Sequence, residues 1–190
     1  MQKRRTILLT AVLGAGLGLT GCGTGAQQDQ PSQSAGQHDG NEHHGGMEHP
    51  MDGGPPPAGI EKAPDAKYPV GSTVRLTTDH MKGMKGAKAT IAGAYDTWTY
   101  SVDYTPKGGG QRVTDHKWVV QEELKDVRGQ RLADGTKATL LADHMKGMKG
   151  AKATIASSTG ETVYMVDYTA DGMTMKNHKW VVESEIRPAK

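Results

Sequence analysis

The sequence predicts an all-β fold in which one small unit occurs twice behind a disordered tether. The first observation is a repeat, because the twelve residues from His80 to Ile91 recur unchanged as His144 to Ile155, 64 residues later. The second is periodicity: short runs alternate or are rich in β-branched and aromatic residues, and no helical pattern reaches ten residues. The third is an N-terminal stretch without any aromatic residue before Tyr68.

Residues 1–21 are predicted to be a lipoprotein signal peptide. A basic start at Lys3, Arg4 and Arg5 precedes an apolar run, residues 7–19, that is too short for a permanent membrane span. Residues 19–22 resemble a bacterial lipobox, which predicts acylation of Cys22, the chain's only cysteine. An ordinary secretory peptide with a chance cysteine is the alternative. We expect an extracytoplasmic protein, lipid-anchored to the outer face of the membrane of a Gram-positive bacterium.

Residues 22–66 are predicted to be a disordered tether, because they offer too little apolar area to offset the entropy of ordering. Without Lys3, Arg4 and Arg5, the 23 basic residues fall to 20 against 21 acidic ones, so no basic surface suggests nucleic acid. The tether also carries a cluster of imidazole and thioether side chains that could bind a metal: His43, His44, Met47, His49 and Met51.

The repeats are predicted to occupy residues 67–128 and 129–190. In the first, strands are expected at 73–78, 88–93, 97–104 and 116–120, and a single helical turn at 121–124 or 183–186 could follow the last strand of either copy. Such short strands suggest a small SH3-like β-barrel for each repeat, packed together in a monomer. One intertwined domain with exchanged strands is the alternative. The expected core anchors are Tyr104, Trp118, Tyr168 and Trp180.

The eight histidines fall into two sets, four in the tether and four at equivalent positions of the repeats. The repeat histidines stand with methionines, and imidazole with thioether suits copper, the thioether favouring Cu(I). Aspartates could accept the imidazole N–H groups. The predicted metal ligands are His80, Met81, Met84, His116, His144, Met145, Met148 and His178, with Asp103 and Asp167 as the supporting acceptors.

Three alternatives remain beside the metal hypothesis. A methionine is usually part of a core, a glycine-rich string can simply form a turn, and a histidine beside Trp and Val can be structural. Lysines within the string would weaken cation binding and suit an anionic wall polymer; these are Lys82, Lys85, Lys146 and Lys149. Signatures of enzymes, such as a nucleophile motif or a phosphate-binding glycine loop, are absent from the sequence.

The string Asp-His-Met-Lys-Gly-Met-Lys-Gly-Ala, then Val-Asp-Tyr-Thr and His-Lys-Trp-Val-Val, resembles the YdhK-type lipoprotein family, whose tandem repeat is a domain of unknown function. The resemblance covers residues 70–187 and the lipobox. Some lipoproteins of this type, including those called CopL, are associated with copper tolerance at the Gram-positive cell surface. The resemblance therefore implies copper binding at the repeat histidines and methionines named above.

The sequence thus leads to two functional hypotheses. The first is a surface lipoprotein that sequesters copper and contributes to copper tolerance, with a copper exporter as a possible partner. The second is a cell-envelope adhesion module that binds anionic wall polymer through its lysine-rich loops. Neither hypothesis requires catalysis.

Overall fold

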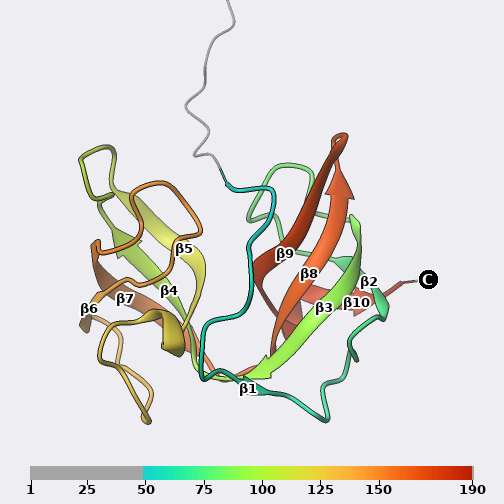
Figure 1. Ribbon diagram of the computed structural model, residues 1–190, viewed down its shortest axis with the longest axis horizontal. Helices are drawn as coiled ribbons and strands as arrows, with labels where there is room; N and C mark the ends of the chain where they lie inside the picture. Colours follow the sequence, from blue (N-terminus) through green and yellow to red (C-terminus); the bar gives the residue numbers. More distant parts are fainter. Residues whose placement is uncertain (1–48, 190) are drawn as a thin grey trace, which may run out of the picture. The chain divides into compact units, whose positions relative to one another are not determined.

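The computed structural model describes residues 49–189, so the predicted signal peptide, Cys22 and most of the tether lie outside the described residues. The described part is all-β and contains two single-turn 3-10 helices and no α-helix (Figure 1). None of its helices is long and apolar enough to cross a membrane. The strands are β1 (Glu61–Lys62), β2 (Thr73–Leu76), β3 (Lys88–Asp96), β4 (Thr99–Tyr104), β5 (Val113–Val120), β6 (Lys137–Thr139), β7 (Lys152–Thr159), β8 (Val163–Ala170), β9 (Met173–Val182) and β10 (Ile186–Pro188).

The strands predicted from alternation are present in both repeats. In β2, for example, Val74 and Leu76 are buried while Thr73 and Arg75 are exposed, as expected for a strand with one face on the core. The predicted turn after the last strand of each repeat is also confirmed. It is the 3-10 helix η1 (Gln121–Glu123) in the first repeat and η2 (Glu183–Glu185) in the second.

The two repeats exchange strands. One sheet has the order β10-β2-β3-β8-β9, with β1 beside β3, and the other has the order β5-β4-β7-β6. The central pair of each sheet joins the two copies. In one sheet β3 of the first repeat pairs with β8 of the second, and in the other β4 of the first repeat pairs with β7 of the second. Each sheet therefore combines the first strands of one repeat with the last strands of the other.

This exchange corrects the expectation of one barrel per repeat and agrees with the alternative of an intertwined domain. The reason is that the exchanged strands are nearly the same sequence, Val102-Asp103-Tyr104 in β4 and Val166-Asp167-Tyr168 in β8. Side-chain pairing therefore does not distinguish a partner within the repeat from one in the other copy. Strand pairing within residues 49–189 closes neither sheet, so an SH3-like barrel is not confirmed.

The core consists of one apolar cluster for each sheet and a third that joins strands of both. The four predicted anchors are all buried, with Trp180 fully so. Trp118 on β5 and Trp180 on β9 share the third cluster with Tyr95 and Met165. Truncation of a buried Trp costs about 3 to 5 kcal/mol, so this cluster is a main tie between the sheets.

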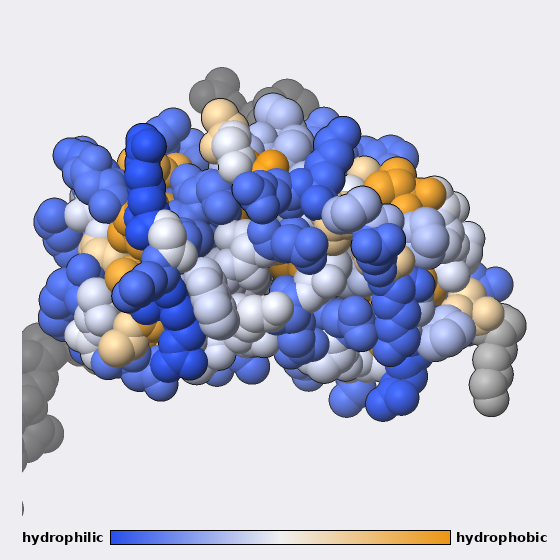
Figure 2. All heavy atoms as spheres, turned by 90° about the horizontal axis from the view of Figure 1, so that it is seen from below, coloured by the Kyte–Doolittle hydropathy of each residue, from blue (hydrophilic) through white to orange (hydrophobic). Residues whose placement is uncertain are grey.

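The exposed surface is mostly hydrophilic on the face seen in Figure 2, where apolar residues are scattered among charged ones. Large exposed apolar side chains are few among the described residues: Met51, Val70, Leu141 and Met173. Both methionines of this group line the cavity that contains the predicted site. Isolated exposed apolar residues are ordinary, but two thioethers at one cavity call for a chemical explanation.

Candidate functional site

The duplicated string forms the same tight loop in both copies. Gly83 and Gly86 have φ values of 78° and 84°, in the left-handed region that favours glycine. The Met84 N–H donates to the Met81 carbonyl at 3.1 Å, and the Gly86 N–H donates to the Leu76 carbonyl at 2.9 Å. Backbone geometry therefore explains much of the identity of the string.

Met84 and Met148 lie in the core and not at the site. Both are fully buried, each in the apolar cluster of one sheet, and neither lines the cavity of the histidines. This differs from the sequence prediction that they are metal ligands. The thioether four residues after each loop histidine thus packs among the apolar side chains of a sheet.

Each loop histidine is held by a glutamate, of which Glu123 is buried and Glu185 is partly buried. The Nε2 of His80 lies 2.7 Å from Oε1 of Glu185, and the Nε2 of His144 lies 2.8 Å from Oε1 of Glu123. Because an ionised carboxylate only accepts, each imidazole donates from Nε2. In the neutral ring this leaves the Nδ1 lone pair free, and both Nδ1 atoms are buried without a partner in the described structure.

The same glutamates connect the two sheets. The Trp118 Nε1–H donates to Glu185 at 3.0 Å, and the Trp180 Nε1–H donates to Glu123 at 2.9 Å. Burial alone would raise the pKa of Glu123, but the charge and hydrogen bond of His144, with further hydrogen bonds, lower its pKa overall. The pKa of Glu185 is lowered against the effect of burial in the same way, with His80 as its partner. Both groups are therefore carboxylates at neutral pH.

The strand histidines, His116 and His178, are aimed inward by irregular backbone. The residues before them, Asp115 and Asn177, both have a φ of 49°, at shifts in the β4–β5 and β8–β9 registers. Such bulges turn the next side chain out of the ordinary pleat. The Asp115 N–H donates to Asp103 at 2.8 Å and thereby fixes the bulge.

Asp167 fixes the second bulge in the same manner, since it accepts from the Asn177 N–H at 2.8 Å and from Lys176 at 2.8 Å. Asp103 also accepts from Arg112. The two aspartates were predicted to accept the imidazole N–H groups. The structure instead has them hold the backbone before each strand histidine, while Glu123 and Glu185, which the sequence prediction omitted, accept from the loop histidines.

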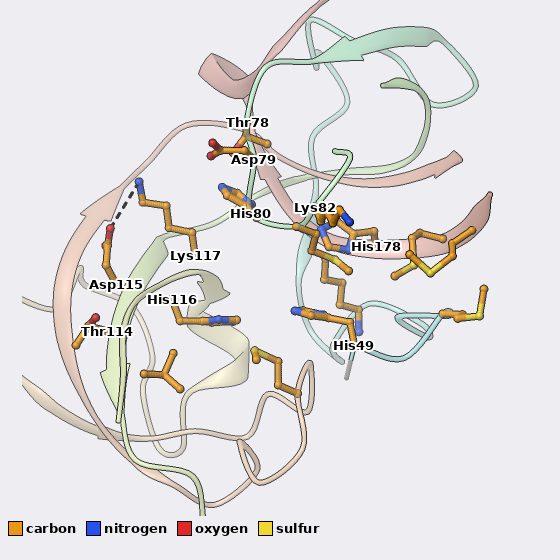
Figure 3. A pocket seen from close by; sticks show the side chains of 17 residues that line it. His49, Thr78, Asp79, His80, Lys82, Thr114, Asp115, His116, Lys117 and His178 are labelled. Atoms are coloured by element: carbon orange, nitrogen blue, oxygen red, sulfur yellow. Dashed lines mark ion pairs between the residues drawn. The ribbon is translucent and has the colours of Figure 1, made fainter. Parts of the chain in front are cut away.

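All four repeat histidines converge at one place. A cavity of about 890 Å³ is lined by His80, His116 and His178, among others, and the His116 and His144 ring centroids are 6.2 Å apart. Figure 3 shows His80, His116 and His178 around this space. The Nε2 atoms of His116 and His178, like the Nδ1 atoms of His80 and His144, are buried without a hydrogen-bond partner in the described part of the chain.

The strand histidines are neutral. Burial, followed by the charges of neighbouring histidines, lowers the pKa of His116 and of His178 to about 3. A neutral imidazole with a free lone pair is the form that binds metals. These two rings, together with His80 and His144, which are each oriented by a carboxylate, resemble the carboxylate–histidine arrangement of metal sites.

Thioethers lie at the same cavity. Met81 and Met145 line it, and each accepts a hydrogen bond from a tyrosine of the other repeat, Tyr168 at 3.6 Å and Tyr104 at 3.7 Å. Sequence reasoning missed three further lining residues on β9, namely Met173, Met175 and Lys179. The period-two spacing of Met173 and Met175 on the strand that carries His178 is a signal that could have indicated the methionines.

Two members of the predicted tether cluster, His49 and Met51, also line this cavity. The His49 ring stacks on that of His116 at a centroid distance of 6.5 Å and an angle of 16°. Burial, followed by the charges of His144 and His80, lowers the pKa of His49. The other three members, His43, His44 and Met47, lie outside the described residues.

The arrangement is not a finished coordination shell. Within residues 49–189, no group of three or more His, Cys, Asp or Glu side chains is placed to hold a metal ion. Ring centroids of the cluster stand 6.1 to 6.5 Å apart, whereas a ligand nitrogen must come within about 2 Å of an ion such as zinc. The donor types and their unpaired nitrogens fit a soft or borderline metal, and binding would require small rotations of the rings.

The predicted anion-binding lysines are placed differently from the histidines. Lys82, Lys85, Lys146 and Lys149 are all exposed, and of these only Lys82 lines the cavity. Their charges are therefore in water, where screening weakens their effect on a buried ion.

The chain matches the family model described as "Protein of unknown function (DUF1541)" at residues 70–121 and again at 134–183. It is 57% identical over 132 residues to an uncharacterised protein of Bacillus subtilis (strain 168), YdhK; the match covers 68% of this chain and 64% of that protein. The chain thus spans somewhat less than two thirds of this relative.

Solved structures of the same relative are similar to this chain. A crystal structure of YdhK, a DUF1541 family protein from B. subtilis, matches with a TM-score of 0.71 and 53% identity, covering 73% of this chain and 98% of that one. A solution NMR structure of the YdhK C-terminal domain matches with a TM-score of 0.61 and 58% identity, covering 63% and 92%. The two matched segments together span more than half of the chain, which therefore belongs to the DUF1541 family of proteins of unknown function.

Proposed function

We propose that this protein is an extracellular, lipid-anchored lipoprotein that binds and sequesters copper and so contributes to copper tolerance. The observation that carries the proposal is a set of four buried ring nitrogens without hydrogen-bond partners in the described structure: those of His80, His116 and His178, which line one cavity, and that of His144, whose ring lies beside His116.

An unpaired buried polar atom costs roughly 1 to 3 kcal/mol, so four of them in one place call for a ligand that recovers the loss. A neutral imidazole offers a lone pair on one of its ring nitrogens, and a cation satisfies several such acceptors at once. Glu123 and Glu185 place a carboxylate at hydrogen-bond distance from the imidazoles of His144 and His80, which increases the basicity of these rings. Metal binding would account both for the unpaired ring nitrogens and for the carboxylates that orient two of the rings.

Copper fits this donor set better than a hard cation does. Imidazole binds copper in both oxidation states, while the thioethers of Met81 and Met145 favour Cu(I). The absence of cysteine from the repeats is suited to an oxidising compartment, where a thiolate ligand would be lost to oxidation. The protein would limit copper entry by mass action, with an exporter as a possible recipient of the metal.

The anchor and location are part of the same proposal and rest on the sequence alone. A lipobox at residues 19–22 would attach Cys22 to the membrane and leave the repeats outside the cell. Globomycin treatment of cells, followed by mass measurement of the protein, tests this part separately. The proposal requires a diacylglyceryl addition at Cys22 that disappears in Cys22→Ala.

The copper part is tested by competition titration of the protein without residues 1–22 against a Cu(I) chelator. His116→Leu and His178→Leu should each weaken copper binding by about 10 to 100-fold, because each removes one nitrogen and adds no new polar group. Lys125→Ala, a change at an exposed lysine away from the cavity, is the matched control. Equal chelator competition by all three variants and the unaltered protein would contradict the proposed site.

The rival function is adhesion to an anionic wall polymer through the exposed lysines of the two loops, which face solvent in both repeats. This function predicts retention on purified cell wall that falls with salt. Replacing Lys82, Lys85, Lys146 and Lys149 by Gln would abolish that retention and leave copper binding nearly unchanged. Retention that is insensitive to these four changes would remove the rival.

A further inference from the structure

We propose that residues 49–54 form a strap that closes over the histidine cluster and adds His49 to the metal site. Metal binding would then fasten the tether to the folded unit. This inference rests on the proposed metal-binding function and goes beyond it, because it assigns a binding role to a segment outside both repeats.

The strap is held on β9 by backbone pairing. Asp52 and Lys176 form a parallel bridge, in which the Lys176 N–H donates to the Met51 carbonyl at 2.8 Å and the Gly53 N–H donates to the Lys176 carbonyl at 2.9 Å. The side-chain amide of Asn177 donates to Asp52 at 3.0 Å. The segment is therefore bridged to β9 two residues before His178.

The fit at Gly53 is close. A Cβ on this residue would lie 2.2 Å from the carbonyl oxygen of Asn177, a backbone atom that cannot move aside without disturbing the bulge before His178. The strap can therefore dock only because residue 53 has no side chain. This requirement gives a means of opening the strap without touching any histidine.

Docking brings the His49 ring between the two strand histidines. Its centroid is 6.5 Å from that of His116 and 6.1 Å from that of His178 (Figure 3). Beneath the strap lies a small cavity of about 20 Å³, lined among others by His49, His144, His178, Asp143 and Lys179. About 10 to 15 Å³ suffices for one water molecule, so this cavity has room for a single small ion or water.

The strap covers only one side of the cluster. The strap contacts Lys176 and Asn177 on β9. The equivalent residues on β5 are Thr114 and Asp115, which are both exposed and line the larger cavity. An ion can therefore reach the cluster from the β5 side while His49 closes the β9 side. Loss of the strap should then mainly increase the rate of release, since it removes a bond to the ion and a cover over it.

Linkage gives the expected consequence for the tether. If docking of the strap strengthens metal binding by some factor, metal binding must strengthen docking by the same factor. The amides of Gly53 and Lys176, which form the bridge, should therefore exchange more slowly with solvent when metal is bound.

The experiment uses the protein without residues 1–22, loaded with one equivalent of Cu(I), and measures the release rate after addition of excess chelator. His49→Ala and Gly53→Val should each release copper about tenfold faster. His38→Ala removes a histidine of the tether outside the strap and should leave the rate unchanged. Hydrogen exchange at Gly53 should slow on copper loading in the unaltered protein and not in His49→Ala.

The outcomes separate this inference from the proposed function. The unaltered protein could bind copper while His49→Ala releases it as slowly as His38→Ala does and copper leaves the hydrogen exchange rate of the Gly53 amide unchanged. In that case the strap proposal is wrong and the copper site stands. If the unaltered protein does not bind copper, both fail. Should Gly53→Val not fold, as judged by its thermal transition, His49→Ala alone decides the matter.

Discussion

The histidines of the first repeat and those of the second differ in environment although their loops are identical in sequence. The side chains of His144 and Glu123 are both 7% exposed, whereas those of His80 and Glu185 are 10% and 16% exposed. His178 is buried and lies beneath the strap, while His116 is only partly buried and faces the open cavity.

This comparison shows what the duplicated string determines and what it does not. Its glycine turns fix the same loop in both copies, so both histidines meet a glutamate in the same way. Burial depends on what lies above each loop, and of the two loop histidines only His144 lines the small cavity beneath residues 49–54. The site therefore has a more deeply buried side, at His144 and His178, and an open side, at His80 and His116, where a ligand can enter and leave.

The largest expected effect that tests this difference is on stability. Glu123→Ala removes the partner of His144 and of the fully buried Trp180, and should lower the free energy of unfolding by about 3 to 5 kcal/mol. Glu185→Ala acts on the more exposed pair and should cost about half as much. Urea denaturation of both variants measures this, with Glu61→Ala, at an exposed position, as the control.

If Glu185→Ala proved as costly as Glu123→Ala, the two sides of the site would be equivalent and the comparison would fail. An equal and small loss for both would show that neither carboxylate supports the fold.

Acid should weaken the metal-free protein through the strand histidines. Their pKa values are lowered to about 3 by burial, and then by neighbouring histidine charges, whereas an unfolded histidine has a pKa of about 6.5. Between these values the unfolded chain binds protons that the folded chain does not. The stability they provide is complete above about pH 6.5 and is lost as pH falls toward 3, by at most about 1.4 kcal/mol per unit for each histidine.

Urea midpoints at pH 7.5, 6.0 and 5.0, in the presence of a chelator, check this expectation. His116→Leu and His178→Leu should each reduce the slope by about half. Glu123 and Glu185, whose pKa values are lowered, begin to lose their contribution only as pH approaches the unfolded glutamate value of about 4.3, so their effect is small between pH 7.5 and 5.0. A midpoint that is constant from pH 7.5 to 5.0 would mean that the histidines are not buried as described.

The methionines provide a matched pair of tests in the same loop. Met81→Leu with Met145→Leu removes the two loop thioethers at the cavity, which Met51, Met173 and Met175 also line, and should weaken Cu(I) binding by about tenfold, because soft donors favour that ion. Met84→Leu with Met148→Leu changes only the core, and should cost less than about 1.5 kcal/mol for each change without altering copper affinity. Chelator competition and urea denaturation of both double variants separate ligand from core. Weaker copper binding in the second variant alone would reverse this assignment.

The exposed lysines should have the smallest effect. Replacing Lys82, the one predicted anion-binding lysine at the cavity, by Gln should raise copper affinity by less than about threefold at 0.15 M salt, because a solvated charge is largely screened. Lys85→Gln, outside the cavity, should have no measurable effect. A large change with Lys85→Gln would show that long-range charge governs the site.

The strands, the final turn, the aromatic anchors and the confinement of histidine to special positions could all be predicted from the sequence, because alternation and repetition are local. Strand exchange could not, because Val102 and Val166 are the same residue type in matching contexts and pair equally well with either copy. The role of Glu123 and Glu185 depends on that exchange, since each accepts from a Trp of the other repeat. Asp103 and Asp167, the acceptors expected from the sequence, hold the backbone before the strand histidines instead.

The central claim is that the histidines of both repeats form one site. NMR of the ¹⁵N-labelled imidazoles during a copper titration tests it most directly. We expect the signals of His80, His116, His144 and His178 to change together and to reach completion at the same copper equivalent, with Nε2–H tautomers for His80 and His144 in the metal-free protein. Two separate sets of changes, one for each repeat at a different equivalent, or no change in these four rings, would contradict the account.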